Sequence, residues 1–167
     1  MARAKFVKAA RKDYPEHDIK KGESYWHWSF YNGRASSRKH YSKTKPKPSQ
    51  LTGSPFLSTL YGCEEAVQDL KADSYDSMED FESDIEGIKG DLENLRDETQ
   101  SSFDNMPEGL QQGDTGQLLE ARVQGLEDLI GEFDGLDFSV DDDKKSTLTE
   151  AIDTLLDEVG GFSWGID

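Results

Sequence analysis

The chain has 167 residues, of which 34% are hydrophobic and 32% are charged, and its formal net charge is −16. This length is typical of one domain or of two small ones, and the low apolar content predicts thin, elongated layers around a small core. Because there is no apolar run of about 18 residues, we expect no membrane-spanning helix. The single cysteine, Cys63, excludes an internal disulfide framework and a Cys-based zinc ribbon, which fits a reducing, cytoplasmic setting.

The charge differs in sign between the two parts of the chain. Residues 1–50 carry 13 Lys and Arg against 4 Asp and Glu, a net +9, whereas residues 51–167 carry 6 against 31, a net −25. We therefore expect a basic head with its Lys/Pro linker over residues 1–52 and an acidic body over residues 53–167. The predicted fold class is α+β, with a small basic N-terminal β-hairpin or sheet followed by an acidic, antiparallel, coiled-coil-like helical bundle.

The head begins with residues 5–12, KFVKAARK, which fit either a short strand or one basic helical turn. From Tyr25 onwards the alternation is that of a strand, with Trp26, Trp28 and Phe30 on one face. These three aromatic side chains are expected to form the core of the head, or else an exposed aromatic surface.

A hairpin turn is predicted at Asn32-Gly33, because a type I′ turn needs positive φ at both of its central positions. In the register that this turn imposes, Trp28 would lie opposite Ser37. His27 and His40 would then lie on the same face of the hairpin.

The candidate functional surface of the head is a nucleic-acid-binding site on the face opposite Trp28. Exposed aromatic rings stack on bases, worth roughly 1–3 kcal/mol each, and Lys and Arg contact the phosphates. The prolines at positions 46 and 48 are expected to keep the lysine-rich segment extended along a nucleic-acid backbone. The alternative for the lysines is a solvated surface that binds nothing specific. The predicted site residues are Tyr25, His27, Tyr31, Arg34, Arg38, Lys39, His40, Tyr41, Lys43, Lys45 and Lys47.

The acidic body is predicted to be helical near residues 55–72, 77–103, 115–134 and 146–159. Apolar residues recur there at alternating spacings of 3 and 4, the pattern of an amphipathic helix. In two of the helices the apolar residues form a stripe, or seam, that is long enough for an antiparallel helical hairpin. Capping boxes are predicted at Asp76/Glu79 for the helix near 77–103 and at Thr147/Glu150 for the last helix. The two seams consist of Met78, Phe81, Ile85, Ile88, Leu92 and Leu95, and of Leu119, Val123, Leu126, Ile130 and Phe133.

The C-terminal segment GGFSWGID carries Phe162 and Trp164 after two glycines. It is either a tail that docks on a partner or a tail folded back on a groove of the protein itself. The dense carboxylates of the body are likewise open to two interpretations: they are solvated helix faces, or they imitate a phosphate backbone.

Three segments, ARKDYPEHDIKKGESYWHW, KHYSKTKPKPSQLT and NMPEGLQQGDTG, resemble small uncharacterised accessory proteins of tailed bacteriophages. The resemblance covers roughly residues 3–130. It implies the cytoplasm of an infected bacterium and a host-directed or non-essential role. No functional residues are carried over from it.

No motif of a catalytic site is present. The sequence has no Gly-rich phosphate loop, no paired-His motif and no nucleophile with a base nearby, so we expect a non-enzymatic protein without metal or cofactor. The leading expectation is binding of DNA or RNA through the head, with helices that form a homo-oligomer or contact a partner. The alternatives are an acidic protein that blocks a host nucleic-acid-handling or defence complex, and a structural component of a phage assembly.

Overall fold

The computed structural model of the chain describes residues 1–30, 39–139 and 145–166. It divides into two compact units, Met1–Gly62 (unit 1) and Cys63–Asp167 (unit 2). The division lies within helix α2 (Pro55–Asp69), beyond the compositional boundary at residue 52. The first turns of α2 belong to unit 1, where the Ser58 hydroxyl donates to the Ser49 carbonyl at 2.9 Å.

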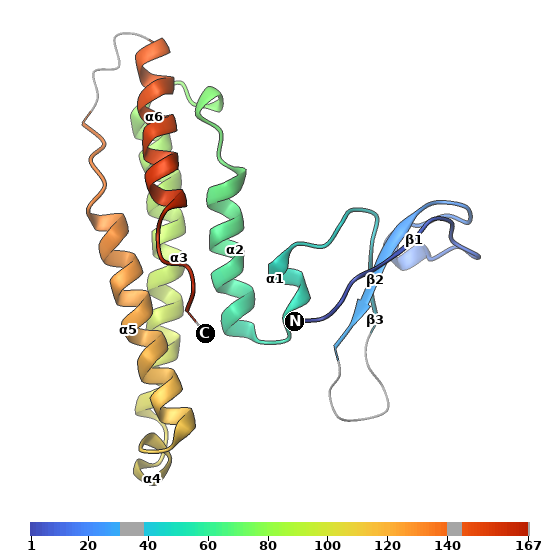
Figure 1. Ribbon diagram of the computed structural model, residues 1–167, viewed down its shortest axis with the longest axis horizontal. Helices are drawn as coiled ribbons and strands as arrows, with labels where there is room; N and C mark the ends of the chain where they lie inside the picture. The colour runs from blue at the N-terminus through green and yellow to red at the C-terminus, as the bar shows by residue number, and fades with distance from the viewer. Residues whose placement is uncertain (31–38, 140–144, 167) are drawn as a thin grey trace. The chain divides into compact units, whose positions relative to one another are not determined.

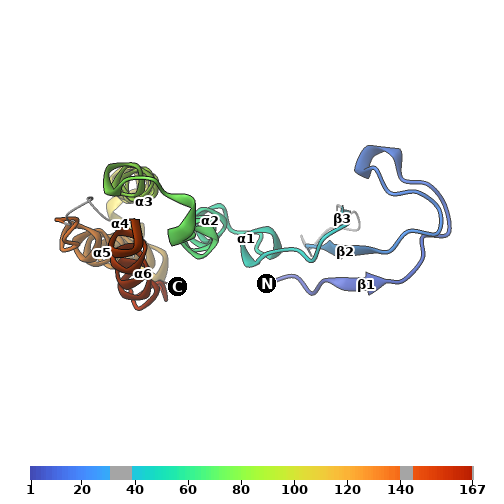
Figure 2. The ribbon, with the colours of Figure 1, turned by 90° about the horizontal axis from the view of Figure 1, so that it is seen from above.

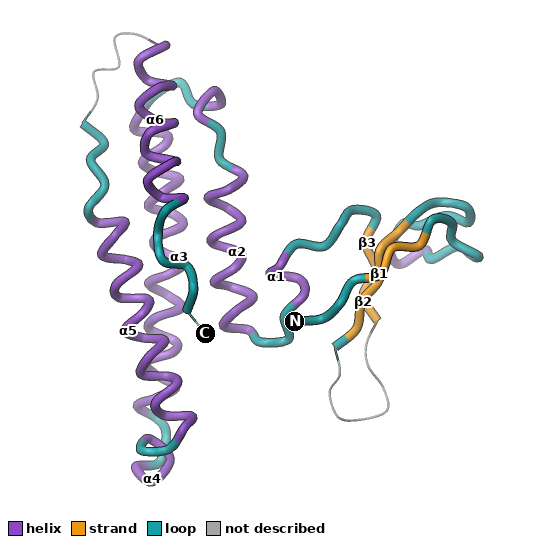
Figure 3. Tube along the Cα trace, viewed as in Figure 1, coloured by secondary structure: helices purple, strands orange, loops and turns teal. Residues whose placement is uncertain are grey.

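Unit 1 contains an antiparallel sheet of three strands, in the order β1 (Lys5–Val7), β2 (Tyr25–Ser29) and β3 (Lys39–Ser42) (Figure 3). The sheet confirms the β part of the predicted α+β class, and of the two interpretations of residues 5–12 the strand is the one found. A 3-10 turn, η1 (Pro15–His17), lies between β1 and β2, and a short helix, α1 (Pro48–Leu51), follows β3.

The predicted register of the hairpin is wrong. Trp28 pairs with His40 and Ser29 with Lys39, whereas the predicted register has Trp28 opposite Ser37. Packing across the strands accounts for the register, because the ring of His40 stacks on Trp28 with a centroid distance of 5.5 Å. The Asn32-Gly33 pair lies outside the described residues.

On the Trp26–Phe30 face, where the core was predicted, Trp28 is buried and Trp26 and Phe30 are half-buried. A second cluster of buried residues lies on the face that carries Tyr25 and was not predicted. The reason is the connection between β1 and β2, which folds over the Tyr25 face and supplies core residues that no strand pattern reveals. Hydrogen bonds between Ala10 and residues 22 and 23 hold this connection in place. The core consists of Ala10, Ile19 and Tyr25, with Val7, Tyr14 and Tyr41 packed against it.

Unit 2 is built on two long helices, α3 (Met78–Asp104) and α5 (Asp114–Asp134), which lie side by side in Figure 1 and Figure 2. They run antiparallel and are joined through the short helix α4 (Glu108–Gln111). Helix α6 (Lys145–Gly160) packs against α3 and against the 3-10 turn η2 (Ala72–Ser74). The predicted helical hairpin is confirmed.

The apolar seams of these helices are buried largely as their spacing predicts. On α3, all six predicted seam residues are buried, joined by Thr99. On α5, Leu119 is only half-buried, whereas Leu129, which was not predicted, is buried. The large hydrophobic side chains that are exposed in the described part of unit 2 are Leu110 and Leu118, with 60% and 41% of their surface accessible.

The caps of two helices differ from the prediction. The N-cap of α3 is Ser77, whose hydroxyl oxygen accepts a hydrogen bond from the Asp80 N–H at 3.1 Å. The predicted Asp76/Glu79 box is therefore displaced by one residue, because both pairs have the sequence spacing of a cap and only one matches the start of the helix. Helix α6 begins at Lys145, so Thr147 lies inside it and is not its cap.

The C-terminal segment is folded back on α5. The rings of Phe162 and Trp164 contact Phe133 edge-on, with centroid distances of 5.1 and 6.0 Å. Ile166 lies over Gly125, where a Cβ atom would be only 3.1 Å from its side chain. Of the two interpretations of this tail, the structure has the one in which it covers the protein's own helix.

Tyr75 makes the stability of unit 2 depend on pH. Burial and a 2.8 Å hydrogen bond that its hydroxyl donates to Asp84 raise the pKa of Tyr75 from 10.0 to about 12. Because the folded state favours the neutral phenol, this stabilisation is complete below pH 10.0 and is lost as the pH rises towards 12.

We therefore expect Tyr75→Phe to remove one late-titrating tyrosine from the phenolate absorbance curve. The free energy of unfolding should also fall less steeply above pH 10.0 in the variant than in the wild type. Superimposable titration curves for the two proteins would contradict this assignment.

Candidate nucleic-acid interface

The face of the sheet opposite the core carries a row of paired side chains across the strands. Phe6 of β1 pairs with Trp26 of β2, which in turn pairs with Ser42 of β3. The two rings are in contact, with centroids 5.1 Å apart and planes inclined by 49°. Phe6 has 51% of its surface exposed, and Trp26 is half-buried.

The next row on this face is covered. Trp28 is only 6% exposed and lies under the ring of His40, which Phe30 contacts edge-on at 5.3 Å. Phe30 in turn lies against Gly53, where a Cβ atom would be 3.5 Å from its ring. The face opposite the core is therefore closed at Trp28 and open at Phe6.

Two tyrosines of the predicted site lie in or against the core. Tyr25 is 8% exposed, and Tyr41 packs against it with ring centroids 5.9 Å apart. The face of this sheet that was predicted to be the open surface is the one that the β1–β2 connection covers. These rings support the fold and offer little area on which a base could stack.

The predicted histidines lie on opposite faces of the sheet. His27 is on the core side, half-buried and paired with Lys5, while His40 is on the other side against Trp28. The sequence placed them together because the predicted register differs from the observed one by an odd number of residues, which exchanges the faces of β3. Lys39 is exposed on the core side, where it pairs with Ser29.

Lys43 is engaged within unit 1. Its ammonium group lies 2.8 Å from Asp18 and 3.7 Å from Glu23. The hydrogen bond between Lys43 and Asp18 raises the pKa of the lysine and lowers the pKa of the carboxyl group. This pair joins β3 to the β1–β2 connection, so Lys43 has a structural role.

The remaining basic residues of the predicted site fall into two groups. Lys45 and Lys47 are exposed, and Pro46 between them is buried. The backbone is extended at Lys47, as predicted, but the extended segment ends there because α1 begins at Pro48. Tyr31, Arg34 and Arg38 lie outside the described residues.

All four carboxylates of residues 1–50 lie in the β1–β2 connection, and three of them bind groups of unit 1 itself. Asp13 accepts a hydrogen bond from the Lys21 N–H at 2.6 Å, and Glu23 accepts one from the Lys20 N–H at 2.8 Å. Asp18 is held by Lys43. The connection packs on the Tyr25 face, so these carboxylates are associated with the face opposite Phe6 and Trp26.

Phe6 and its flanking lysines, Lys5 and Lys8, were missed as site residues. All three are exposed. The signal that could have found them is the pattern K-F-V-K, in which an aromatic residue lies between lysines on a strand at the edge of the sheet.

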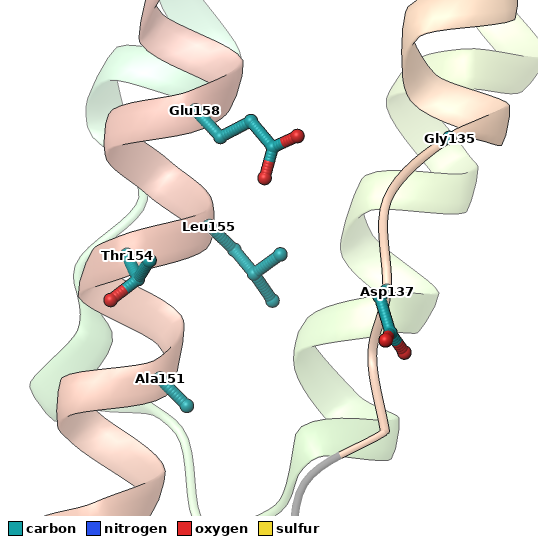
Figure 4. Close-up of a pocket in the computed structure, with 6 residues that line it drawn as sticks. All are labelled: Gly135, Asp137, Ala151, Thr154, Leu155 and Glu158. Atoms are coloured by element: carbon teal, nitrogen blue, oxygen red, sulfur yellow. The ribbon is translucent and has the colours of Figure 1, made fainter.

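Unit 2 has a shallow pocket of about 330 Å³ between α6 and the segment after α5 (Figure 4). Its charged lining residues are acidic, unlike the exposed lysines of the sheet. Leu155 points into the pocket, and the carboxylates of Asp137 and Glu158 lie on its two sides. The negative charge disfavours a phosphate ligand. The lining residues are Gly135, Asp137, Ala151, Thr154, Leu155 and Glu158.

No family model, curated protein or solved structure matches the chain. The resemblance to phage accessory proteins therefore stays a prediction from the sequence. In the described residues, no group of His, Cys, Asp and Glu side chains is arranged to hold a metal ion.

Over the same part of the chain, every helix is too short or too polar to cross a membrane. Burial raises the pKa of the Cys63 thiol to about 11, so the thiol is protonated at neutral pH and is not an activated nucleophile.

Proposed function

We propose that the chain is a non-enzymatic nucleic-acid-binding protein, in which unit 1 binds DNA or RNA and unit 2 associates with a second copy or with a protein partner. In keeping with the sequence resemblance, we propose a phage accessory protein that acts in the host cytoplasm. The observation that supports binding is the arrangement of charge in unit 1: lysines are exposed along the sheet, while most of the carboxylates bind groups of the unit itself.

The lysines named by this proposal are Lys5 and Lys39 on the core side of the sheet and Lys45 after β3, all exposed. Contacts between such side chains and phosphates release counterions, so that the affinity falls steeply with salt whatever the base sequence. The net −25 of residues 51–167 repels phosphate, which directs a nucleic acid towards unit 1.

The test is a comparison of two double variants of the full chain with equal changes in charge. Lys5→Glu with Lys39→Glu reverses charges on the strands of the sheet, whereas Lys20→Glu with Lys21→Glu reverses them on the β1–β2 connection. We measure fluorescence anisotropy of labelled DNA and RNA over a salt series. The first variant should lower the affinity by about tenfold or more and flatten the salt dependence by about two phosphate contacts, with a smaller effect of the second.

Binding that is absent for the wild-type chain at low salt would overturn the proposal. Equal losses in the two double variants would show that only the net charge matters, and would refute the assignment to the sheet. Circular dichroism of each variant establishes that its secondary structure is retained.

A second candidate is a protein that imitates nucleic acid with its acidic helices and blocks a host nucleic-acid-handling or defence complex. The observation that favours it is the outer surface of α3, which exposes carboxylates over its whole length, including Glu79, Asp84, Asp91 and Glu98. Its signature is a wild-type chain that binds no nucleic acid but displaces DNA from a basic DNA-binding protein. The same carboxylates could also bind a basic component in a phage assembly.

A further inference from the structure

We propose that the ligand of unit 1 is single-stranded nucleic acid, and that Phe6 and Trp26 form the platform on which an unpaired base stacks. This inference rests on the proposed function and names its substrate class. Phe6 was not predicted as a site residue, and Trp26 was predicted to lie either in the core or on an exposed aromatic surface.

Phe6 is an exposed aromatic side chain. The large hydrophobic side chains that are exposed in the described residues are Met1, Phe6, Leu110 and Leu118, and Phe6 is the aromatic one among them. It lies at the middle of β1, with its ring against Trp26 on the neighbouring strand. An aromatic ring held in this way by a sheet presents apolar area at little cost in side-chain entropy.

The sheet holds the platform of Phe6 and Trp26 in place. Trp26 lies in β2 between two strands, beside the closed row in which His40 stacks on Trp28 with planes inclined by only 15°. Phe6 and Trp26 are directly paired in the register of the sheet, so their separation is set by the backbone. A base that stacks on these rings meets a surface that is already formed.

Lysines lie close to the platform along the edge of the sheet. Lys5 and Lys8 are exposed on either side of Phe6 in the sequence, and β1 is an edge strand. Lys5 pairs with His27 on the core side, so it reaches a phosphate backbone where that backbone follows the edge of β1. The carboxylates of residues 1–50 lie in the connection that packs on the other face. Charge complementarity thus favours a polyanion over an apolar protein partner at this surface.

Stacking on an aromatic side chain is possible for single strands and not for duplexes. In a duplex the bases are stacked on one another and paired, so their faces are not available to an aromatic side chain. In a single strand every base has a free face, and stacking on a protein ring contributes to binding with little regard to sequence. An exposed phenylalanine between lysines therefore favours single-stranded ligands.

The experiment measures the affinity of the full chain for a labelled single-stranded DNA, for a single-stranded RNA and for the DNA duplex of the same sequence. We compare the wild type with Phe6→Ala, with the ring-retaining Phe6→Tyr and with Leu118→Ala as an exposed apolar control on unit 2. We expect tighter binding of single strands than of the duplex. Phe6→Ala should weaken single-strand binding by about 10- to 100-fold, with an unchanged salt slope, while Phe6→Tyr and Leu118→Ala stay close to the wild type.

The failures of the two proposals are distinguishable. Salt-dependent binding that is equal for single strands and duplex and indifferent to Phe6→Ala would overturn the inference and leave the proposed function standing. A chain that binds none of the three ligands would overturn both. If Phe6→Ala leaves nucleic-acid binding intact but lowers the solution mass, Phe6 belongs to a contact between protein copies and the inference is wrong.

Discussion

Replacing Leu126 by Asp is expected to unfold the helices of unit 2. Leu126 lies in the middle of α5 with none of its surface exposed, on the seam that packs against α3. The substitution removes a buried apolar side chain and introduces a carboxylate without a partner, which together cost several kcal/mol. Since a domain of this size is stable by about 5–15 kcal/mol, most of its stability would be lost.

The measurement is the helical signal in far-ultraviolet circular dichroism, together with its thermal transition. The matched control is Leu118→Asp, the same change on the same helix at a position with 41% of its surface exposed. The control should retain the helical content and the transition of the wild type. Wild-type helicity and melting temperature in Leu126→Asp would show that α3 and α5 do not pack through this seam.

Two glycines of α5 are expected to respond to alanine with opposite signs. Gly116 is buried in the first turn of the helix, and a Cβ atom there would meet the carbonyl oxygen of Gln111 and lie 2.6 Å from its Cα. Because these are backbone atoms, the connection between α4 and α5 must move. We expect Gly116→Ala to destabilise the protein by about 1–3 kcal/mol.

Gly131 is the control on the same helix. A Cβ atom at this position meets nothing within 4 Å, so Gly131→Ala gains helix propensity without a clash. It should stabilise the protein by up to about 1 kcal/mol, which denaturant unfolding resolves as a higher midpoint with the same slope. If Gly116→Ala raised the midpoint as Gly131→Ala does, the close approach of α4 to the start of α5 would be refuted.

The helical hairpin could be predicted in detail because its determinants are local. All six predicted seam residues of α3, from Met78 to Leu95, are buried, since a spacing of 3 and 4 places them on one side of any helix. Errors arise where neighbouring positions are equally suitable. Ser77 and Asp76 both offer an acidic residue three positions later, and only the start of the helix decides which one is the cap.

The candidate site was predicted only in outline. The basic character of residues 1–50, the strand from Tyr25 and the presence of aromatic residues follow from composition and alternation. Composition and alternation do not predict which face of the sheet remains open. The packing of His40 on Trp28 and of Tyr41 on Tyr25 determines the register, and a shift by an odd number of residues reverses which β3 side chains lie beside those of β2.

The choice of the open face depends on contacts between residues far apart in the chain. Ile19 and Ala10 cover Tyr25 because the β1–β2 connection folds back over the Tyr25 face of the sheet. No periodicity in residues 8–24 predicts this packing. The role proposed for Phe6 likewise depends on a contact that the sequence does not predict, namely its pairing with Trp26. Helical periodicity and net charge can therefore be obtained from the sequence because each is a property of a single segment or of a sum. The exposed Phe6–Trp26 row is decided by the tertiary structure, because burial depends on which segments meet.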